Sequence, residues 1–446
     1  MATTTHPHAF HFSRAVDSYW EATADPLEIA TPKLATETSC EVAVIGAGFT
    51  GLSAALELAE SGIDVRVLEA GHVGWGASGR NGGFACIGSH KLSYGAMIRR
   101  YGLAATRSYH AAMRQSVELV CDNLSRFAID AQASGDGEVT LAHAASRVAA
   151  LQEEQAFLKQ TFGEDTEFLP RAELVARGLQ GPGFHAGLKA HVGFGVHPLN
   201  YVRGLARAAA RAGAPIHAQS PLVRWEETAT GHRLHTPEGV LTARHVIVAT
   251  NGYTPEQVST RHRGRLMPAL SSIIVTRPLS ADERRQQGWT SPLMAYDSRK
   301  LLHYFRLLPD GRFLFGGRGG TDASDTGGQA FRPLLTENFR RLFPAWSEVE
   351  VTHYWRGFVC LAYDLVPYVG ALDERNTVWT AIAYHGNGVA MGSWSGRAVA
   401  RLLLKKTARE ELPPVLTRRL ARFPLPAFRP LYLKGAYLWY GWQDGR

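Results

Sequence analysis

The fold of this chain is decided by one stretch near its start, Cys40-Glu-Val-Ala-Val-Ile-Gly46-Ala-Gly48-Phe-Thr-Gly51-Leu-Ser-Ala-Ala-Leu-Glu-Leu-Ala. A short apolar run, a Gly-x-Gly-x-x-Gly turn and an Ala/Leu-rich segment predict a parallel strand, a tight turn and a helix. The first glycine permits the turn, the second lets backbone N–H groups approach a pyrophosphate, and the third lets the helix pack closely on the strand. The positive end of the helix dipole then faces the phosphates.

A second predicted strand, Val65-Arg-Val-Leu, follows and ends at the acid Glu69. A carboxylate at this place accepts hydrogen bonds from both hydroxyls of an adenosine ribose and repels a 2′-phosphate, which argues against NADP. The sequence therefore predicts a dinucleotide site whose contacts from this region are Gly46, Gly48, Phe49, Thr50, Gly51, Glu69 and Ala70.

The composition is that of an ordinary globular enzyme, with 446 residues, 45 % hydrophobic and 20 % charged. This length is enough for two domains with their own cores. The net charge of +8 comes from scattered arginines without interleaved aromatic residues, so no nucleic-acid partner is predicted.

The four cysteines lie far apart and form no Cys-x-x-Cys pair, so neither a disulfide framework nor a metal site is predicted. Free cysteines fit a reducing cytoplasm, which is the predicted location. The first residues contain no long apolar stretch of a signal peptide, and no apolar run is long enough for a transmembrane segment.

Strand-plus-glycine segments recur at residues 42–51, 245–252 and 378–392. A contiguous NAD-binding domain would be complete within about its first 150 residues. The wide spacing instead predicts an α/β nucleotide-binding domain in discontinuous pieces with a second domain inserted. The predicted boundaries are an N-terminal arm at 1–37, a nucleotide-binding domain at 38–100, 195–262 and 355–446, and a substrate-binding domain at 101–194 and 263–354.

Periodicity adds individual elements to this outline. Ala-rich segments predict helices over 104–128 and 143–161, and apolar or alternating runs predict strands at 221–225, 302–307 and 378–383.

Further motifs carry a family resemblance that extends over nearly the whole chain. They include Ser18-Tyr19-Trp20, the run Gly76-Ala-Ser-Gly79-Arg80-Asn81-Gly82-Gly83, His197-Pro-Leu-Asn200, Trp355-Arg-Gly357 and Pro367-Tyr-Val-Gly370. With these motifs the chain resembles the FAD-dependent amine and amino-acid oxidoreductases of the D-amino-acid oxidase, glycine oxidase and sarcosine oxidase type. The resemblance implies a discontinuous Rossmann-like FAD domain and an inserted α+β substrate domain with an antiparallel sheet.

The same resemblance implies further FAD contacts along the chain. The small residues of the Gly76 run would pass along the ribityl chain and ring, since only they allow close backbone contact. The implied contacts are Gly76, Ala77, Ser78, Gly79, Arg80, Asn81, Gly82, Gly83, Leu222, Val223, Thr250, Asn251, Gly252, Gly386, Asn387, Gly388, Val389, Ala390 and Met391.

The implied reaction is oxidation of an amine C–N bond by hydride transfer to flavin N5, followed by hydrolysis of the imine to an aldehyde. The expected substrate is a γ-glutamylputrescine-like or other primary or secondary amine, with oxygen or another electron acceptor. Tyr304, Arg306 and Arg318 are the candidate pocket residues, and His385 is a further one. An arginine on a buried strand needs an anionic partner, which favours Arg306 and Arg318 as substrate contacts.

Two positions bear on substrate and cofactor attachment. Glycine oxidase-like relatives clamp the substrate carboxylate with an arginine where this chain has Val359. Some relatives attach FAD through a cysteine in the region of Cys360, but the positions do not coincide, so non-covalent FAD is predicted.

Three alternatives stay open at the level of sequence. The chain could be an α-amino-acid or N-methyl-amino-acid oxidase of the glycine or sarcosine oxidase type, which Val359 disfavours. It could be a flavin-binding module without amine chemistry. The segment Leu431–Trp442 could be a membrane-surface helix, although packing against the body of the protein is favoured. The sequence does not fix an oligomeric state.

Overall fold

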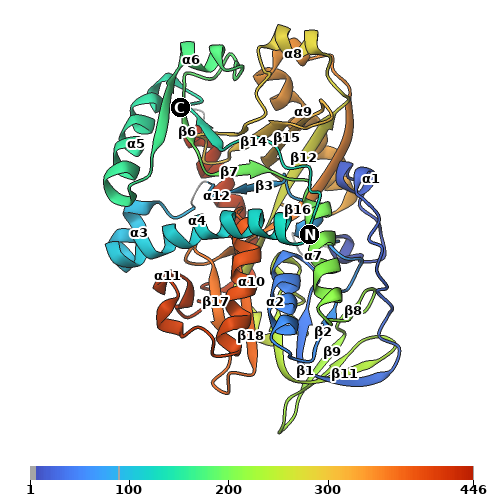
Figure 1. Cartoon of the computed structure of the whole chain (residues 1–446). Coiled ribbons are helices and arrows are strands. Elements are labelled where there is room, and N and C mark those ends of the chain that lie inside the picture. Colours follow the sequence, from blue (N-terminus) through green and yellow to red (C-terminus); the bar gives the residue numbers. More distant parts are fainter. Residues whose placement is uncertain (1–6, 89–90, 445–446) are drawn as a thin grey trace.

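The computed structural model describes residues 7–88 and 91–444, and its strands form two large sheets, one in each half of the molecule (Figure 1). The first sheet has the order β17 (Tyr368–Ala371), β18 (Val378–Ile382), β11 (Val240–Val248), β1 (Glu37–Ile45), β2 (Val65–Leu68) and β8 (Ile216–His217). Strand β1 pairs in parallel with β11 and β2, so segments about 200 residues apart in sequence lie side by side. The predicted discontinuous nucleotide-binding sheet is confirmed.

This sheet also contains antiparallel strands. Strand β17 pairs antiparallel with β18, and the ribbon of β9 (Arg224–Glu227) and β10 (His232–His235) pairs antiparallel with β11. The predicted strand at 221–225 is observed as β9, which begins three residues later than predicted. Just before it, the backbone N–H of Val223 bonds to the carbonyl oxygen of His235.

Helices cover this sheet. They are α2 (Phe49–Glu60), α7 (Pro198–Arg211) and α10 (Ala390–Leu403), and α2 contacts both of the others. Close approach of α10 to α2 depends on Gly396, since a Cβ there would lie 2.1 Å from the carbonyl oxygen of Thr50. The long helix α4 (Leu103–Arg126) crosses the middle of the molecule after α3 (Tyr94–Tyr101) and packs on α10 (Figure 1).

The second sheet is mainly antiparallel. Its order is β16 (Val351–Ala362), β12 (Leu266–Thr276), β15 (Phe313–Arg318), β14 (His303–Leu307), β13 (Met294–Asp297), β4 (Glu138–Leu141), β6 (Ala186–Ala190) and β5 (Thr166–Pro170). Only β13 and β4 pair in parallel within this order. The inserted α+β domain with an antiparallel sheet is thus confirmed.

Aromatic side chains form much of the core on this sheet. Trp289, Phe305, Phe313 and Phe343 are completely buried and meet mostly edge to face. Helices α5 (Val148–Phe162), α6 (Arg171–Ala176), α8 (Ala281–Gln287) and α9 (Asp325–Leu342) flank the sheet. A small ribbon of β3 (Phe84–Cys86) and β7 (Gly193–Gly195) lies between the two halves (Figure 1).

The structure corrects two details of the predicted organisation. The boundary placed before residue 355 falls inside β16, which pairs with β12 along its length and so belongs to the second sheet. The helix expected over 143–161 begins as α5 at Val148, after a 3₁₀ turn at Ala145–Arg147.

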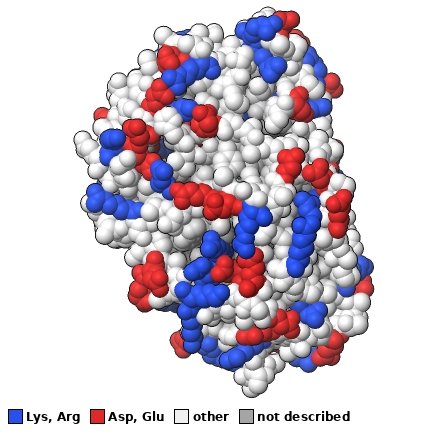
Figure 2. Space-filling model, viewed as in Figure 1, with Lys and Arg blue, Asp and Glu red and all other residues white. Residues whose placement is uncertain are grey.

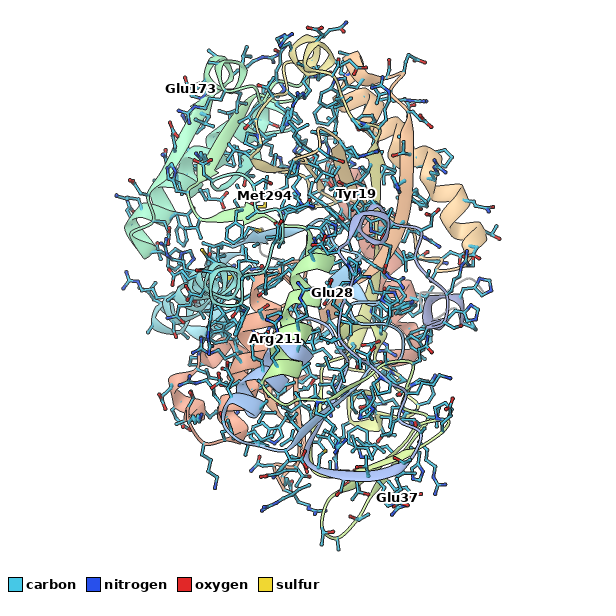
Figure 3. All side chains as sticks on the ribbon, turned by 45° about the vertical axis from the view of Figure 1, so that its right-hand side comes forward. Tyr19, Glu28, Glu37, Glu173, Arg211 and Met294 are labelled. Carbon is cyan, nitrogen blue, oxygen red and sulfur yellow. The ribbon has the colours of Figure 1, made fainter. Side chains whose placement is uncertain are left out.

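The N-terminal arm is packed against the body of the protein over its described residues. Its helix α1 (Tyr19–Thr23) is capped by Ser18, and Tyr19 and Trp20 are buried. The Tyr19 hydroxyl donates to Asp310 Oδ2 at 2.9 Å, which ties the arm to the second domain. Figure 3 places Tyr19 at the junction of the two halves and Glu37 at the far end of the nucleotide-binding half. The chain ends with α11 (Pro414–Thr417) and α12 (Arg429–Asp444).

Candidate active site

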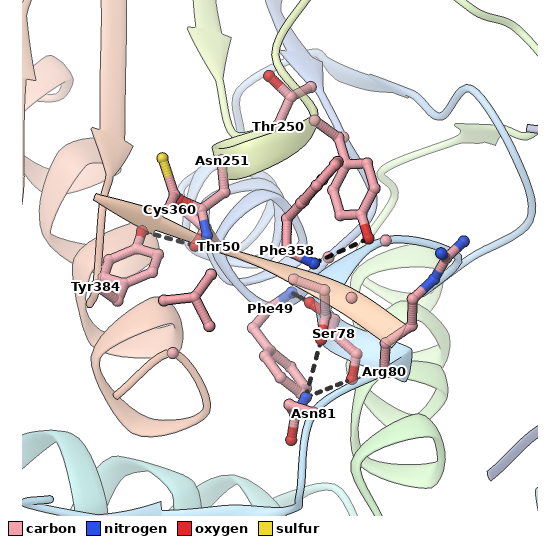
Figure 4. Close-up of a pocket in the computed structure, with 18 of the residues that line it drawn as sticks. Phe49, Thr50, Ser78, Arg80, Asn81, Thr250, Asn251, Phe358, Cys360 and Tyr384 are labelled. Carbon is pink, nitrogen blue, oxygen red and sulfur yellow. Dashed lines mark hydrogen bonds between the residues drawn. The ribbon is translucent and has the colours of Figure 1, made fainter. Parts of the chain in front are cut away.

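One long cavity runs from the carboxyl ends of the parallel strands to the second sheet (Figure 4). The predicted contact residues that line it are Gly46, Gly48, Phe49, Thr50, Glu69, Ala70, Gly76, Ala77, Ser78, Arg80, Asn81, Gly82, Leu222, Thr250, Asn251, Tyr304, Arg318, His385, Gly386, Asn387, Gly388 and Val389. The structure therefore brings together segments that are more than 300 residues apart in sequence.

The cavity begins where β1 turns into α2. The glycine turn is held by Ser78, whose hydroxyl accepts the backbone N–H of Phe49 at 3.0 Å. A Cβ at Gly48 would lie 2.7 Å from that same hydroxyl oxygen, so the close approach of the loop to the helix N-terminus requires glycine. The free N–H groups of this first helical turn are what a pyrophosphate needs.

Glu69 ends β2 at the cavity wall and is only 8 % exposed. Its two carboxylate oxygens accept the backbone N–H groups of Ala47 and Gly71 at 2.7 and 2.8 Å. Burial raises the pKa of this carboxyl, while these two hydrogen bonds oppose the shift. Each oxygen keeps a second lone pair for a ligand hydroxyl, as the ribose of a dinucleotide would supply.

The loop after β2 is rigidly held by side-chain hydrogen bonds. The Asn81 amide donates to the carbonyl oxygens of Ala77 and Ser78 and accepts the N–H of Gly83 (Figure 4). The indole N–H of Trp20 bonds to the carbonyl oxygen of Asn81, and that of Trp355 bonds to Arg80. Arm, loop and second sheet are thereby joined at one point of the cavity wall.

Arg80 lines the cavity, and its guanidinium group is only partly hydrogen-bonded. Its Nε donates to the Trp75 carbonyl at 2.8 Å, and its guanidinium lies 4.0 Å from the Trp75 ring centre. Its Nη2 is buried without a hydrogen-bond partner among the described residues. A buried guanidinium N–H without a partner is costly, and an anionic cofactor group in this cavity would satisfy it. The backbone cradle, the acid and this donor together fit FAD.

Backbone in the left-handed region occurs at and beside another wall of the cavity, which Asn251 and His385 line. Asn251, Ala383 and His385 have φ values of 44°, 66° and 57°, which is uncommon for residues with a side chain. The Asn251 carboxamide oxygen accepts the N–H of Ala383 at 3.0 Å and so links two of these positions. Such conformations persist only where the surroundings hold them, and they gather at ligand sites.

At the second sheet the cavity is mostly apolar, with Leu302 and Val359 in its wall. Tyr304 donates to or accepts from the Ser271 hydroxyl at 2.9 Å, and burial raises the pKa of Tyr304 to about 12. Arg318 is the charged residue at this end, since the other charged residues lining the cavity are Glu69 and Arg80 at the cofactor end. Burial lowers the pKa of His385 to about 3, so its ring is neutral at physiological pH.

Arg306 does not face the cavity, contrary to the prediction. Its Nε and Nη2 donate to the carbonyl oxygens of Gly82 and Val196 at 3.1 and 2.6 Å, and its guanidinium lies over Trp20. Backbone carbonyls thus satisfy two nitrogens of Arg306 without an anion, while its Nη1 is buried without a hydrogen-bond partner among the described residues. Arg306 holds the Gly82 loop to the second domain and is not among the residues that line the cavity.

Other predicted contacts also lie outside the cavity lining; they are Gly51, Gly79, Gly83, Val223, Gly252, Ala390 and Met391. Several of these glycines serve packing, since a Cβ at Gly51 would lie 1.8 Å from the Gly46 carbonyl oxygen. Cys360 does line the cavity. Its thiol is buried, and burial raises its pKa, so the reactive thiolate is disfavoured.

Sequence reasoning missed residues that tertiary structure brings to the site. Phe12 from the arm and Tyr296 from β13 line the cavity. Lys91 and Tyr437 lie near Arg318, and each interacts electrostatically with it. None of these four residues lies in a recognisable motif, because each reaches the site through the packing of its own segment.

Comparisons with known proteins agree with this geometry. The sequence family described as DAO, FAD dependent oxidoreductase, matches residues 41–402. Gamma-glutamylputrescine oxidoreductase of Escherichia coli is 31 % identical over 88 % of this chain and 89 % of its own length. A probable oxidoreductase, OrdL, of Haemophilus influenzae is 31 % identical over 89 % of this chain and 90 % of its own.

A solved structure shares the fold. Glycine oxidase from Geobacillus kaustophilus superposes with a TM-score of 0.69 at 22 % identity, over 86 % of this chain and all of that one. The chain therefore belongs to the DAO family and is a FAD-dependent oxidoreductase.

Proposed function

We propose that this enzyme oxidises the C–N bond of an amine that carries an anionic group at its far end, of the γ-glutamylputrescine class. The observation that carries the proposal is the charge pattern of the cavity beyond the cofactor region. Val359 leaves an apolar wall where glycine oxidase-like relatives have an arginine, and Arg318 supplies a positive charge elsewhere on the same wall. The named E. coli relative supports the same substrate class.

Arg318 is the proposed partner of the substrate carboxylate. Its Nη2 donates a long 3.4 Å hydrogen bond to the carbonyl of His385, and its Nε is buried without a partner among the described residues. Burial lowers the pKa of Arg318, but a guanidinium group keeps its proton in proteins. A buried, incompletely bonded guanidinium favours an anionic ligand.

Other residues that line the cavity favour an uncharged amine. Tyr304 and His385 are both neutral at physiological pH, so neither stabilises an ammonium group by charge. Leu302 and Val359 line the same space with apolar side chains. An unprotonated amine carries the lone pair that its oxidation requires, and bound FAD supplies the hydride acceptor.

A substrate screen tests the proposal. Anaerobic bleaching of the flavin is measured with γ-glutamylputrescine and putrescine, and with glycine, sarcosine and D-alanine, while the aldehyde product is trapped. γ-Glutamylputrescine should bleach the flavin at least about a hundredfold more efficiently than the amino acids, which equals roughly 2.7 kcal/mol of discrimination. If sarcosine or D-alanine proved the best substrate, the enzyme would be an amino-acid oxidase.

A further inference from the structure

The last segment of the chain exposes large apolar side chains to an unusual degree. Leu425, Leu438 and Trp439 are 69 %, 78 % and 55 % exposed, and Phe428, Leu431 and Trp442 are 47–58 % exposed. We define these six residues as the C-terminal apolar face. They lie within 18 residues of sequence, on α12 and the turn that leads into it. Monomeric proteins rarely leave so contiguous a group of large apolar side chains in water.

The two sides of α12 differ sharply. Leu431, Leu438 and Trp442 recur at the helical spacing that places residues on one side, and Trp439 stacks on Trp442 with ring centres 5.1 Å apart. The opposite side holds the helix to the protein. There Leu433 is buried, and the Asp444 carboxylate accepts the backbone N–H groups of Lys300 and Leu301 at 2.7 and 2.8 Å. The exposed side of α12 is therefore not the side that holds the helix to the rest of the protein.

The chain segment that carries this face is rich in basic residues, and its one acid, Asp444, is bonded to the backbone N–H groups of Lys300 and Leu301. Residues 412–443 contain no aspartate or glutamate but five basic residues. Two of them are paired, Arg418 with Asp364 and Arg429 with Glu256. The other three, Arg419, Arg422 and Lys434, are exposed, and no ion pair is recorded for them among the described residues.

We propose that the C-terminal apolar face, together with the exposed Arg419, Arg422 and Lys434 of the same chain segment, binds the surface of an anionic lipid bilayer. Indole rings and leucines enter the boundary between headgroups and acyl chains, and arginine and lysine pair with anionic headgroups. Within the described residues no helix is long and apolar enough to cross a membrane, so this helix lies on the bilayer.

The basic residues of this segment favour an anionic bilayer, and not a second copy of the chain, as the partner of the C-terminal apolar face. Two such faces in symmetric contact would bring the same unpaired cations toward one another, which costs energy. An anionic bilayer neutralises these charges while it covers the apolar side chains. On the face of the molecule shown in Figure 2, side chains of both signs are interspersed.

The test uses the FAD-loaded enzyme and co-sedimentation with vesicles. One set is phosphatidylcholine alone, and the other contains phosphatidylglycerol as well. The wild type should pellet with the anionic vesicles, and added salt should weaken this binding. The double variant L438S/W439S should bind at least about tenfold more weakly, whereas L334S, a matched change at a leucine 59 % exposed on α9, should bind as the wild type does.

A second variant keeps the test decisive if L438S/W439S fails to retain flavin. R422Q/K434Q leaves the apolar side chains in place and should lose the preference for phosphatidylglycerol. Failure of the wild type to bind anionic vesicles, or equal binding by the wild type and the folded variants, would overturn the proposal. Sedimentation velocity without vesicles provides the other arm, since a dimer that L438S/W439S abolishes, without vesicle binding, would identify a second copy as the occupant.

Discussion

Arg318 joins the second sheet to the cavity and carries the proposed substrate preference. Its replacement by methionine keeps most of the side-chain volume but removes the charge. The KM for γ-glutamylputrescine should rise by about tenfold or more, because one charged hydrogen bond is worth roughly 1.5–3 kcal/mol. Putrescine, which lacks the carboxylate, should be affected little. Arg318→Lys, which keeps a cation, serves as the matched control, and equal losses for both amines would make Arg318 structural.

Glu69 has a double role that the structure adds to the predicted one. It closes the turn through Ala47 and Gly71 and offers its remaining lone pairs to a ribose. Glu69→Ala should weaken FAD binding by roughly 2–4 kcal/mol, since charge-assisted hydrogen bonds are lost. Glu69→Gln should weaken it less because one acceptor remains. Binding is measured by FAD titration of the apoprotein, and unchanged affinity in both variants would remove Glu69 from the cofactor site.

At the scale of elements, α12 is a separable unit tied down at its end. Asp444 accepts two backbone hydrogen bonds from the 300–301 turn, beside β14. Asp444→Ala should leave these N–H groups without the carboxylate and free the last helical turn. Hydrogen exchange within 429–444 should then become faster, while exchange in α10 stays unchanged. Protection equal to the wild type throughout α12 would show that Leu433 and its neighbours hold the helix without this cap.

Elements with local signals were predictable, and those defined by distant contacts were not. Strand β14 begins within one residue of its predicted start, and β18 ends within one residue of its predicted end, because apolar runs bounded by turns determine them. The course of β16 across the predicted boundary depends on pairing with β12, which no local pattern reports. Arg306 shows the same limit at the site, since its burial was foreseeable but its carbonyl partners were not.

The whole molecule places its cofactor cavity between two domains assembled from alternating segments. Cys86 and Cys360 line the cavity, and burial raises the pKa of both thiols, so a reactive thiolate is disfavoured at each. The purified enzyme should therefore be yellow with about one FAD per chain, released on acid or heat denaturation. Flavin that stays with the precipitated chain would indicate a covalent bond, and loss of that bond in Cys360→Ser would assign it.

Stability against pH provides a test of the core between the domains. Glu138 on β4 is 3 % exposed, and burial raises the pKa of its carboxyl from 4.5 to about 7. The native state thus holds a proton that the unfolded state releases between these values. Its contribution to stability is fully present below about pH 4.5 and is lost as pH rises through about 7, amounting to about 3 kcal/mol at most.

Glu138→Gln keeps the shape and removes the titration. Thermal unfolding of wild type and variant is compared from pH 4.5 to 8, because the difference between them cancels the other titrating groups. The wild type should lose stability relative to the variant as pH rises, with most of the change below pH 7. Lys91, whose pKa burial lowers to about 7, acts with the opposite sign above that pH and is common to both proteins. A constant difference across the range would mean that Glu138 titrates with an ordinary pKa, and hence that water reaches it from the cavity.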